Sequence, residues 1–243
     1  MSETVRHRAD VRAAIVEAAA RLLREGGPAA VTTRGVAERA GVQAPTIYRL
    51  FGDKDGLLEA VAEHVMATFV AAKSAAMDAA AAADVDPVED LRASWHRQIA
   101  FGLANPAVHR LLSDPDRALD SPAARAGKEI LVLRVRRLAM AGRLKVTEAH
   151  AVDLVQAAGV GTIQHLLATP VDRRDPELGD AMLDAVLARI LTAPSREAPD
   201  GPVSAAVALR AFAPQLDALT EPERALLAEW LDRITASPAG TAG

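Results

Sequence analysis

Three polar side chains that can hydrogen-bond to nucleic-acid bases follow one another at three-residue spacing: Gln43, Thr46 and Arg49. In an α-helix, residues three or four apart lie on the same face. Arginine can pair with both major-groove acceptors of guanine, glutamine can read adenine, and threonine can contact a thymine methyl group. This spacing therefore predicts a helix face that reads base edges in the major groove of duplex DNA.

The segment from Val31 to Lys54 predicts the elements that would present this face, a helix-turn-helix beginning at Thr33. Gly41 can take the positive φ of a tight interhelical turn, and Thr32 or Thr33 can cap the first helix. Small and apolar residues fill the predicted inward positions: Val36, Ala37, Ala40, Val42, Ile47 and Leu50. With these side chains buried, the polar face of the second helix must point outward.

The segments TTRGVAERAGV, PTIYRLF and GDKDGLL in this register resemble the TetR (tetracycline-repressor-type) family, and the resemblance runs from Asp10 to about His64. It implies an all-α fold with a DNA-binding head, a long connecting helix and a ligand-binding, dimerising body. Lys54 would contact a backbone phosphate, and Arg39 is open between a DNA contact and a solvated side chain. The residues expected at the DNA are Thr33, Arg34, Gln43, Ala44, Pro45, Thr46, Tyr48, Arg49 and Lys54.

The composition of the 243-residue chain agrees with a helical protein. Half of the residues are apolar, only 3% are aromatic, and alanine is abundant, which favours helix over sheet. No strand pattern is visible. The absence of cysteine excludes disulfides and thiolate metal sites and fits a reducing compartment. No secretory signal is apparent, and the weakly charged run 155–171 is a poor membrane span, so we expect a cytoplasmic protein without a membrane partner.

The net charge of −4 does not by itself indicate a nucleic-acid-binding protein. Residues 1–60 carry a net charge of +1, and the remainder carries −5. Because phosphate contacts supply most non-specific affinity, such a weakly basic head would depend on pairing with a second copy.

Helix starts and stops can be placed along most of the chain. A first helix is expected over 10–25, ended by Gly26, Gly27 and Pro28, and a long fourth helix from Asp53 to the 79–83 alanine run. Later helices are expected to begin at Asp86-Pro87, Asn105-Pro106, Ser121-Pro122, Thr147, Asp175-Pro176 and Thr220. The predicted domains are a DNA-binding domain (1–54), a ligand-binding and dimerisation domain (55–195), and a linker with a last amphipathic helix (196–243).

By the same resemblance, a homodimer would form through helices at about 147–168 and 176–191, on (pseudo)palindromic operator DNA. Alternatively, the apolar stripes of these helices only pack the core of one subunit. The stripe residues are Leu154, Ile163, Leu166, Leu167, Met182, Leu183, Val186, Leu187 and Ile190.

A pocket for a small, largely apolar effector is expected in the body, lined by Phe69, Trp95, Phe101 and Met140, with polar groups from His96, His109, Gln156, Gln164 and His165. The six histidines lack metal-ligand spacing, and no catalytic motif appears, so we expect no metal, no cofactor and no enzyme activity. The predicted function is a transcriptional regulator, a repressor released by its effector. The alternative is a helical ligand-binding or protein-interaction bundle with a degenerate DNA-binding head.

Overall fold

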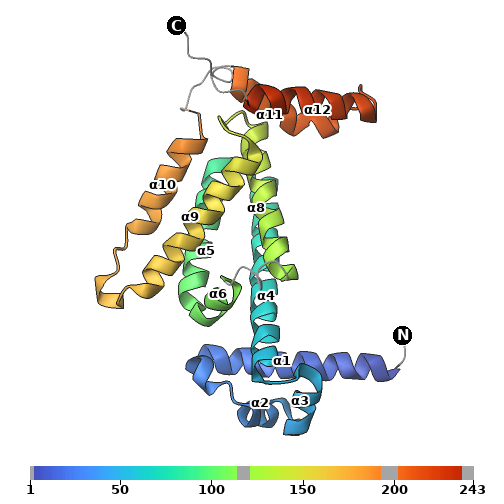
Figure 1. Cartoon of the computed structure of the whole chain (residues 1–243), viewed down its shortest axis with the longest axis vertical. Helices are drawn as coiled ribbons and strands as arrows, with labels where there is room; N and C mark the ends of the chain where they lie inside the picture. Colours follow the sequence, from blue (N-terminus) through green and yellow to red (C-terminus); the bar gives the residue numbers. More distant parts are fainter. Residues whose placement is uncertain (1–2, 114–120, 193–201, 237–243) are drawn as a thin grey trace. The chain divides into compact units, whose positions relative to one another are not determined.

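The computed structural model describes residues 3–113, 121–192 and 202–236, and it is all-α in these ranges (Figure 1). No strand forms in them, although Leu144 and Leu191 make an isolated antiparallel bridge. The predicted fold class is therefore confirmed. The chain divides into two compact units, Met1–Ala75 with Phe101–Gly127 and Ala76–Ala100 with Lys128–Gly243.

The first unit holds the head. Its helices are α1 (Glu3–Ala30), α2 (Thr33–Ala40), α3 (Ala44–Phe51), the first part of α4 (Lys54–Ala82) and α6 (Pro106–Leu112). One apolar cluster joins α1 to α4, because each of these helices turns an apolar face inward. Its buried members are Ile15, Val16, Ala19, Ala20, Val31, Val36, Ala37, Ile47, Leu57 and Val61.

Helix α1 is longer than predicted, since it begins at Glu3 rather than at Asp10. No glycine or proline lies between these positions, so nothing in the backbone stops the helix there. At its other end Gly27 interrupts the helical conformation with a φ of 69°, at the predicted stop.

The second unit contains α9 (Glu148–Ala168), α10 (Leu178–Ile190), α11 (Pro202–Phe212) and α12 (Glu221–Ala236), with short 3₁₀ turns at Val171–Arg173 and Ala213–Gln215. Helices α5 (Pro87–Ala104) and α8 (Pro122–Met140) contribute residues to both units, as does α4. In Figure 1, α9 runs beside α10, and α11 packs on α12. The core of this unit includes Leu91, Trp95, Val135, Leu138, Leu144, Val152, Val155, Leu183, Leu187 and Ile190.

Several predicted caps are present as hydrogen bonds to the first turn of a helix. The side chains of Asp86 and Ser121 accept from the backbone N–H groups of Val88 (2.8 Å) and Ala124 (3.0 Å). Thr147 accepts from the N–H of His150 at 3.3 Å. These bonds satisfy N–H groups that have no partner inside the helix.

The last part of the chain differs from the prediction. Helix α11 begins at Pro202, where the sequence predicts the end of a linker, because proline is also favoured in the first turn of a helix. The rest of that linker lies outside the described residues. Helix α10 begins at Leu178 rather than directly after Asp175, whose carboxylate accepts from the N–H of Glu177 at 2.8 Å.

The dimer stripe named from the sequence is wrong for most of its residues. Ile163, Leu166, Leu183, Leu187 and Ile190 are all buried inside their own chain. The small and apolar residues exposed on α9 and α10 include Ala157, Val160, Gly161, Met182 and Ala185, beside exposed polar residues such as Gln156, Gln164 and Asp184. An apolar stripe in the sequence does not reveal whether other helices of the same chain or a second subunit cover it.

By length and composition alone, α4 is the one helix among the described residues that could cross a membrane. Its first turns contribute Leu57 and Val61 to the head core. Its polar residues Glu63 and His64 bond to Ser121 and Glu17 in the same unit. The first turns of α4 are therefore packed in the head, whereas only 11% of its most apolar window is buried and its later turns are rich in alanine.

Candidate DNA-binding surface

The turn between α2 and α3 has the geometry that the sequence indicates. The hydroxyl of Thr32 caps α2 by accepting from the N–H of Gly35 at 3.1 Å. Gly41 follows α2 with a φ of 68°, a conformation that disfavours any residue with a Cβ. The N–H of Val42 donates to the carbonyl of Ala37 at 3.0 Å, which closes the end of α2 as in a Schellman motif.

Ile47 fixes which face of α3 points outward, since only 1% of its surface is exposed. Gln43, Pro45, Tyr48 and Arg49 are exposed in consequence. Tyr48, at 54% exposure, is a large side chain without a core position.

Three other predicted contact residues are partly buried. Thr33 and Thr46 are half-buried, and Ala44 packs against the head core. Gln43 occupies the N-cap position of α3, yet its side chain makes no capping bond. Its amide therefore retains its hydrogen-bonding groups for an external partner.

The cations of the head differ in whether the rest of the chain engages them; Arg12, for example, lies 5.1 Å from the centre of the Phe51 ring. No hydrogen bond or ion pair in the described part of the chain engages the side chains of Arg34, Arg49 or Lys54, and all three are exposed. They come from the start of α2, from α3 and from the start of α4.

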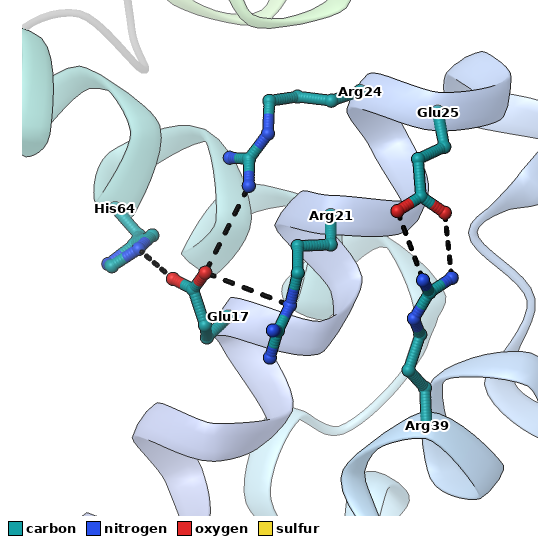
Figure 2. A network of polar contacts seen from close by, with 6 residues as sticks. All are labelled: Glu17, Arg21, Arg24, Glu25, Arg39 and His64. Carbon is teal, nitrogen blue, oxygen red and sulfur yellow. Dashed lines mark hydrogen bonds and ion pairs between the residues drawn. The ribbon is translucent and has the colours of Figure 1, made fainter.

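Three other arginines, on α1 and α2, are paired with carboxylates of the head (Figure 2). Arg39 donates to both oxygens of Glu25, at 2.7 and 3.0 Å. Arg21 and Arg24 lie 3.8 and 4.0 Å from Glu17. Arg39 is therefore not simply a solvated side chain, because its bonds to Glu25 tie α2 to α1. A contact of Arg39 with DNA stays a prediction.

Two more contacts fix the head around α4. Glu17 lies 3.0 Å from Nε2 of His64, which joins α1 to α4. The carboxylate of Asp53 accepts from the N–H of Gly56 at 2.8 Å. A Cβ on Gly56 would lie 2.2 Å from the carbonyl oxygen of Phe51, so only glycine fits this close approach between α3 and α4.

The residues predicted to line an effector pocket fall on both units. In the first unit, the rings of Phe69 and Phe101 stack at 3.9 Å with an 11° interplanar angle. The ammonium of Lys73 lies 5.6 Å from the Phe69 ring centre. Burial lowers the pKa of His109 in α6, which favours its neutral form near neutral pH.

In the second unit, Trp95 is 3% exposed and its indole N–H donates to the carbonyl of Gly179 at 2.9 Å. Met140 is partly buried against the same core. His96 is exposed and lies 2.6 Å from Asp180. Gln156, Gln164 and His165 are exposed on α9. A role for any of these residues in effector binding stays a prediction.

Sequence reasoning did not single out Glu63 of α4. Its carboxylate accepts from the hydroxyl of Ser121 at 2.6 Å and from the backbone N–H of Ala123 at 2.7 Å. It therefore caps the start of α8 from another helix. Ser121 and its following proline signal a helix start, but no local pattern marks a capping partner so distant in sequence.

The comparisons with known proteins agree with this geometry. Residues 15–61 match the model of the bacterial regulatory proteins of the tetR family. The regulator BetI of Burkholderia thailandensis is 42% identical over 72 residues, 28% of this chain and 37% of that protein. An HTH-type transcriptional repressor of Mycobacterium tuberculosis is 45% identical over 58 residues, 24% of this chain and 31% of that protein. The chain thus spans about a third of the length of these curated relatives.

The similarity to solved structures extends further. A TetR-family transcriptional regulator from Agrobacterium tumefaciens has a TM-score of 0.54 at 19% identity, over 76% of this chain and 100% of that one. About a quarter of the present chain thus has no counterpart in that structure. Together with the inward anchoring of α3, these likenesses show that residues 15–61 form a domain of the tetR family of bacterial regulatory proteins.

Proposed function

We propose that this protein is a homodimeric transcriptional regulator that binds (pseudo)palindromic operator DNA and is released from it by a small, largely apolar effector. The match of residues 15–61 to the tetR family model supports DNA-binding regulation. The observation that carries the proposal further is the division of cations in the head. Arg34, Arg49 and Lys54 have no partner in the described chain, whereas Arg39 is held by Glu25.

In this proposal the three exposed cations and the polar face of α3 have different roles. Arg34, at the start of α2, and Lys54, at the start of α4, suit phosphates on either side of the groove. Gln43, Thr46 and Arg49 approach base edges, and Tyr48 donates its hydroxyl to a phosphate. Thr33, Ala44 and Pro45 would complete the contact surface between the start of α2 and the start of α3.

Stable binding to DNA should need two heads, because one head carries little net positive charge to pair with phosphates. A two-fold pair would present two α3 helices to half-sites one helical turn apart. The exposed surface of α9 and α10 is a suitable pairing surface, since Ala157 and Gly161 permit close approach and Val160 and Met182 supply apolar area.

Repression and release follow as a linkage between two sites. If the effector favours a conformation in which the heads no longer match the groove, operator DNA must weaken effector binding by the same factor, on the order of 5–150-fold. The half-buried Phe69 and Phe101 rings support an apolar effector. The M. tuberculosis relative is named a repressor, which favours repression over activation here.

The experiment begins with selection of bound fragments from a pool of random duplex DNA. Fluorescence anisotropy then compares the wild type with Gln43→Ala and Thr46→Ala on the selected fragment and on a scrambled one. Arg173→Ala, at an exposed position outside the head, serves as the control. Both head variants should lose most of the preference for the selected fragment. If they fold and keep that preference, α3 does not read the sequence.

The alternative function, a ligand-binding or interaction bundle with a degenerate head, gives a different result. Selection would then enrich no sequence, and residual DNA binding would be equal for all duplexes. Sedimentation of the protein without DNA tests the pairing separately, because a monomer would contradict the dimer whatever the DNA result.

A further inference from the structure

We infer that α12 is a self-association surface that pairs antiparallel with α12 of a second copy of this chain. Three large apolar side chains lie on its exposed surface at four-residue intervals. They are Leu226, Trp230 and Ile234, which are 44%, 51% and 45% exposed. Such a stripe of large side chains on one helix is typical of a helix that packs against another helix.

The stripe is not the face that attaches α12 to its own chain. Leu231, 6% exposed, is the buried residue of α12, and it points about 100° around the helix from Trp230. The carboxylate of Asp232 accepts from Nε of Arg210 in α11 at 3.1 Å, and Arg224 donates to the carbonyl of Leu219 at 2.6 Å. Helix α12 is thus held by one face and presents a second apolar face to solvent.

The charges beside the stripe identify a second copy as the occupant. Glu229 and Arg233 follow one edge of the stripe, with side chains 67% and 64% exposed. In an antiparallel two-fold pair centred near Trp230, Leu226 of each chain faces Ile234 of the other. The same operation places Glu229 of each chain beside Arg233 of the other. The apolar and the charged positions are therefore both self-complementary, as an isologous interface requires.

The size of the surface sets its strength. Three large side chains per copy form an interface smaller than the roughly 1,200 Å² of stable complexes. The pairing should therefore be weak and should act where chains are concentrated or already joined elsewhere. The pairing of α12 does not depend on DNA binding, so a protein that fails to bind operator DNA could still associate through α12.

Disulfide trapping tests the geometry, because the 243-residue chain has no cysteine of its own. We expect L226C and I234C to cross-link when mixed under mild oxidation and to cross-link poorly when each is alone. In the antiparallel pair, the two copies of residue 226 are about 12 Å apart along the helix axis, beyond the ~7 Å Cα separation of a disulfide. A225C mixed with I234C is the matched control, since Ala225 is exposed on another side of α12. Equal cross-linking in single variants, or none in the mixture, would overturn the proposal.

Charge reversal provides a second test by sedimentation. E229R alone and R233E alone should each associate several-fold more weakly, because two symmetric ion pairs become repulsive. An equimolar mixture of the two should recover association, since each chain then meets opposite charges across the interface. The repulsion that each variant introduces within its own helix remains in the mixture, so recovery isolates the contact between chains. W230A should weaken association by about 30-fold or more, as expected of a central aromatic residue. Association unaffected by W230A would contradict the inference.

Discussion

Arg49 has no partner among the described residues, whereas Arg39 is bonded to Glu25. We therefore predict that substitutions at these two positions have different effects on DNA binding. Replacement of Arg49 by alanine removes a guanidinium that no group in the described chain engages. Replacement of Arg39 removes one that donates two hydrogen bonds to Glu25. Both side chains are exposed, so exposure alone would not separate them.

The expected magnitudes follow from these contacts. A bidentate contact to a base contributes about 1–3 kcal/mol, so Arg49→Ala should weaken binding on the order of 5–150-fold per head. A phosphate contact would instead lower the salt slope by about 0.9 per head, or about 1.8 for a dimer. Arg39→Ala should leave that slope unchanged. It should reduce the free energy of unfolding by only about 0.2–1 kcal/mol, since the Arg39–Glu25 pair is exposed to solvent.

The assay is anisotropy on a selected duplex between about 50 and 200 mM salt, with thermal unfolding of each variant as the folding control. Arg49→Lys distinguishes a base contact from a phosphate contact, because lysine keeps the charge but loses the planar fork. Glu25→Gln is the matched partner change, as it releases Arg39 without deleting it. An Arg39→Ala variant that changed the salt slope as much as Arg49→Ala, or an Arg49→Ala variant that bound like the wild type, would contradict the different roles of the two arginines.

Further predictions concern the supports of the head and the pairing surface. Gly56→Ala should lower the free energy of unfolding by about 1–3 kcal/mol, as in overpacked sites, because the added Cβ meets a backbone oxygen at 2.2 Å; thermal unfolding checks this, with Gly179→Ala as a control where the added Cβ would lie at an ordinary 4.0 Å from Nε1 of Trp95. Glu63→Ala should cost about 1.5–3 kcal/mol in urea unfolding, as for bonds to charged groups, while Glu63→Gln should cost less; equal stability of both variants with the wild type would exclude the cap on α8. Gly161→Phe should give a folded monomer by sedimentation if the exposed face of α9 pairs the subunits, and an unchanged dimer would place the interface elsewhere. Burial lowers the pKa of His109 in the folded chain below its ordinary value of 6.5. Below that pH the unfolded chain therefore binds more protons than the folded one, so the free energy of unfolding should fall as the pH drops through 6.5. Urea unfolding at several pH values should show a smaller fall in His109→Gln.

The sequence determined the elements that are encoded locally. Thr32 caps α2 and Gly41 takes the positive φ of the turn, because both properties belong to the residue and its immediate neighbours. The inward face of α3 was also predictable, because Ile47 and Leu50 are apolar residues three positions apart. The head core indeed buries Ile47 and packs against Leu50. Hence the predicted DNA-facing residues are mostly exposed, while their contacts with DNA stay predictions.

Only the tertiary structure decided which partner each group takes. Nothing in the local sequence pairs Arg39 with Glu25 or Glu63 with the start of α8. The apolar stripes of α9 and α10 were visible in the sequence, but whether Leu183 and Ile190 face their own subunit depends on which helices pack beside them. Periodicity specifies that a helix has an apolar side, whereas long-range packing selects the surface that covers it.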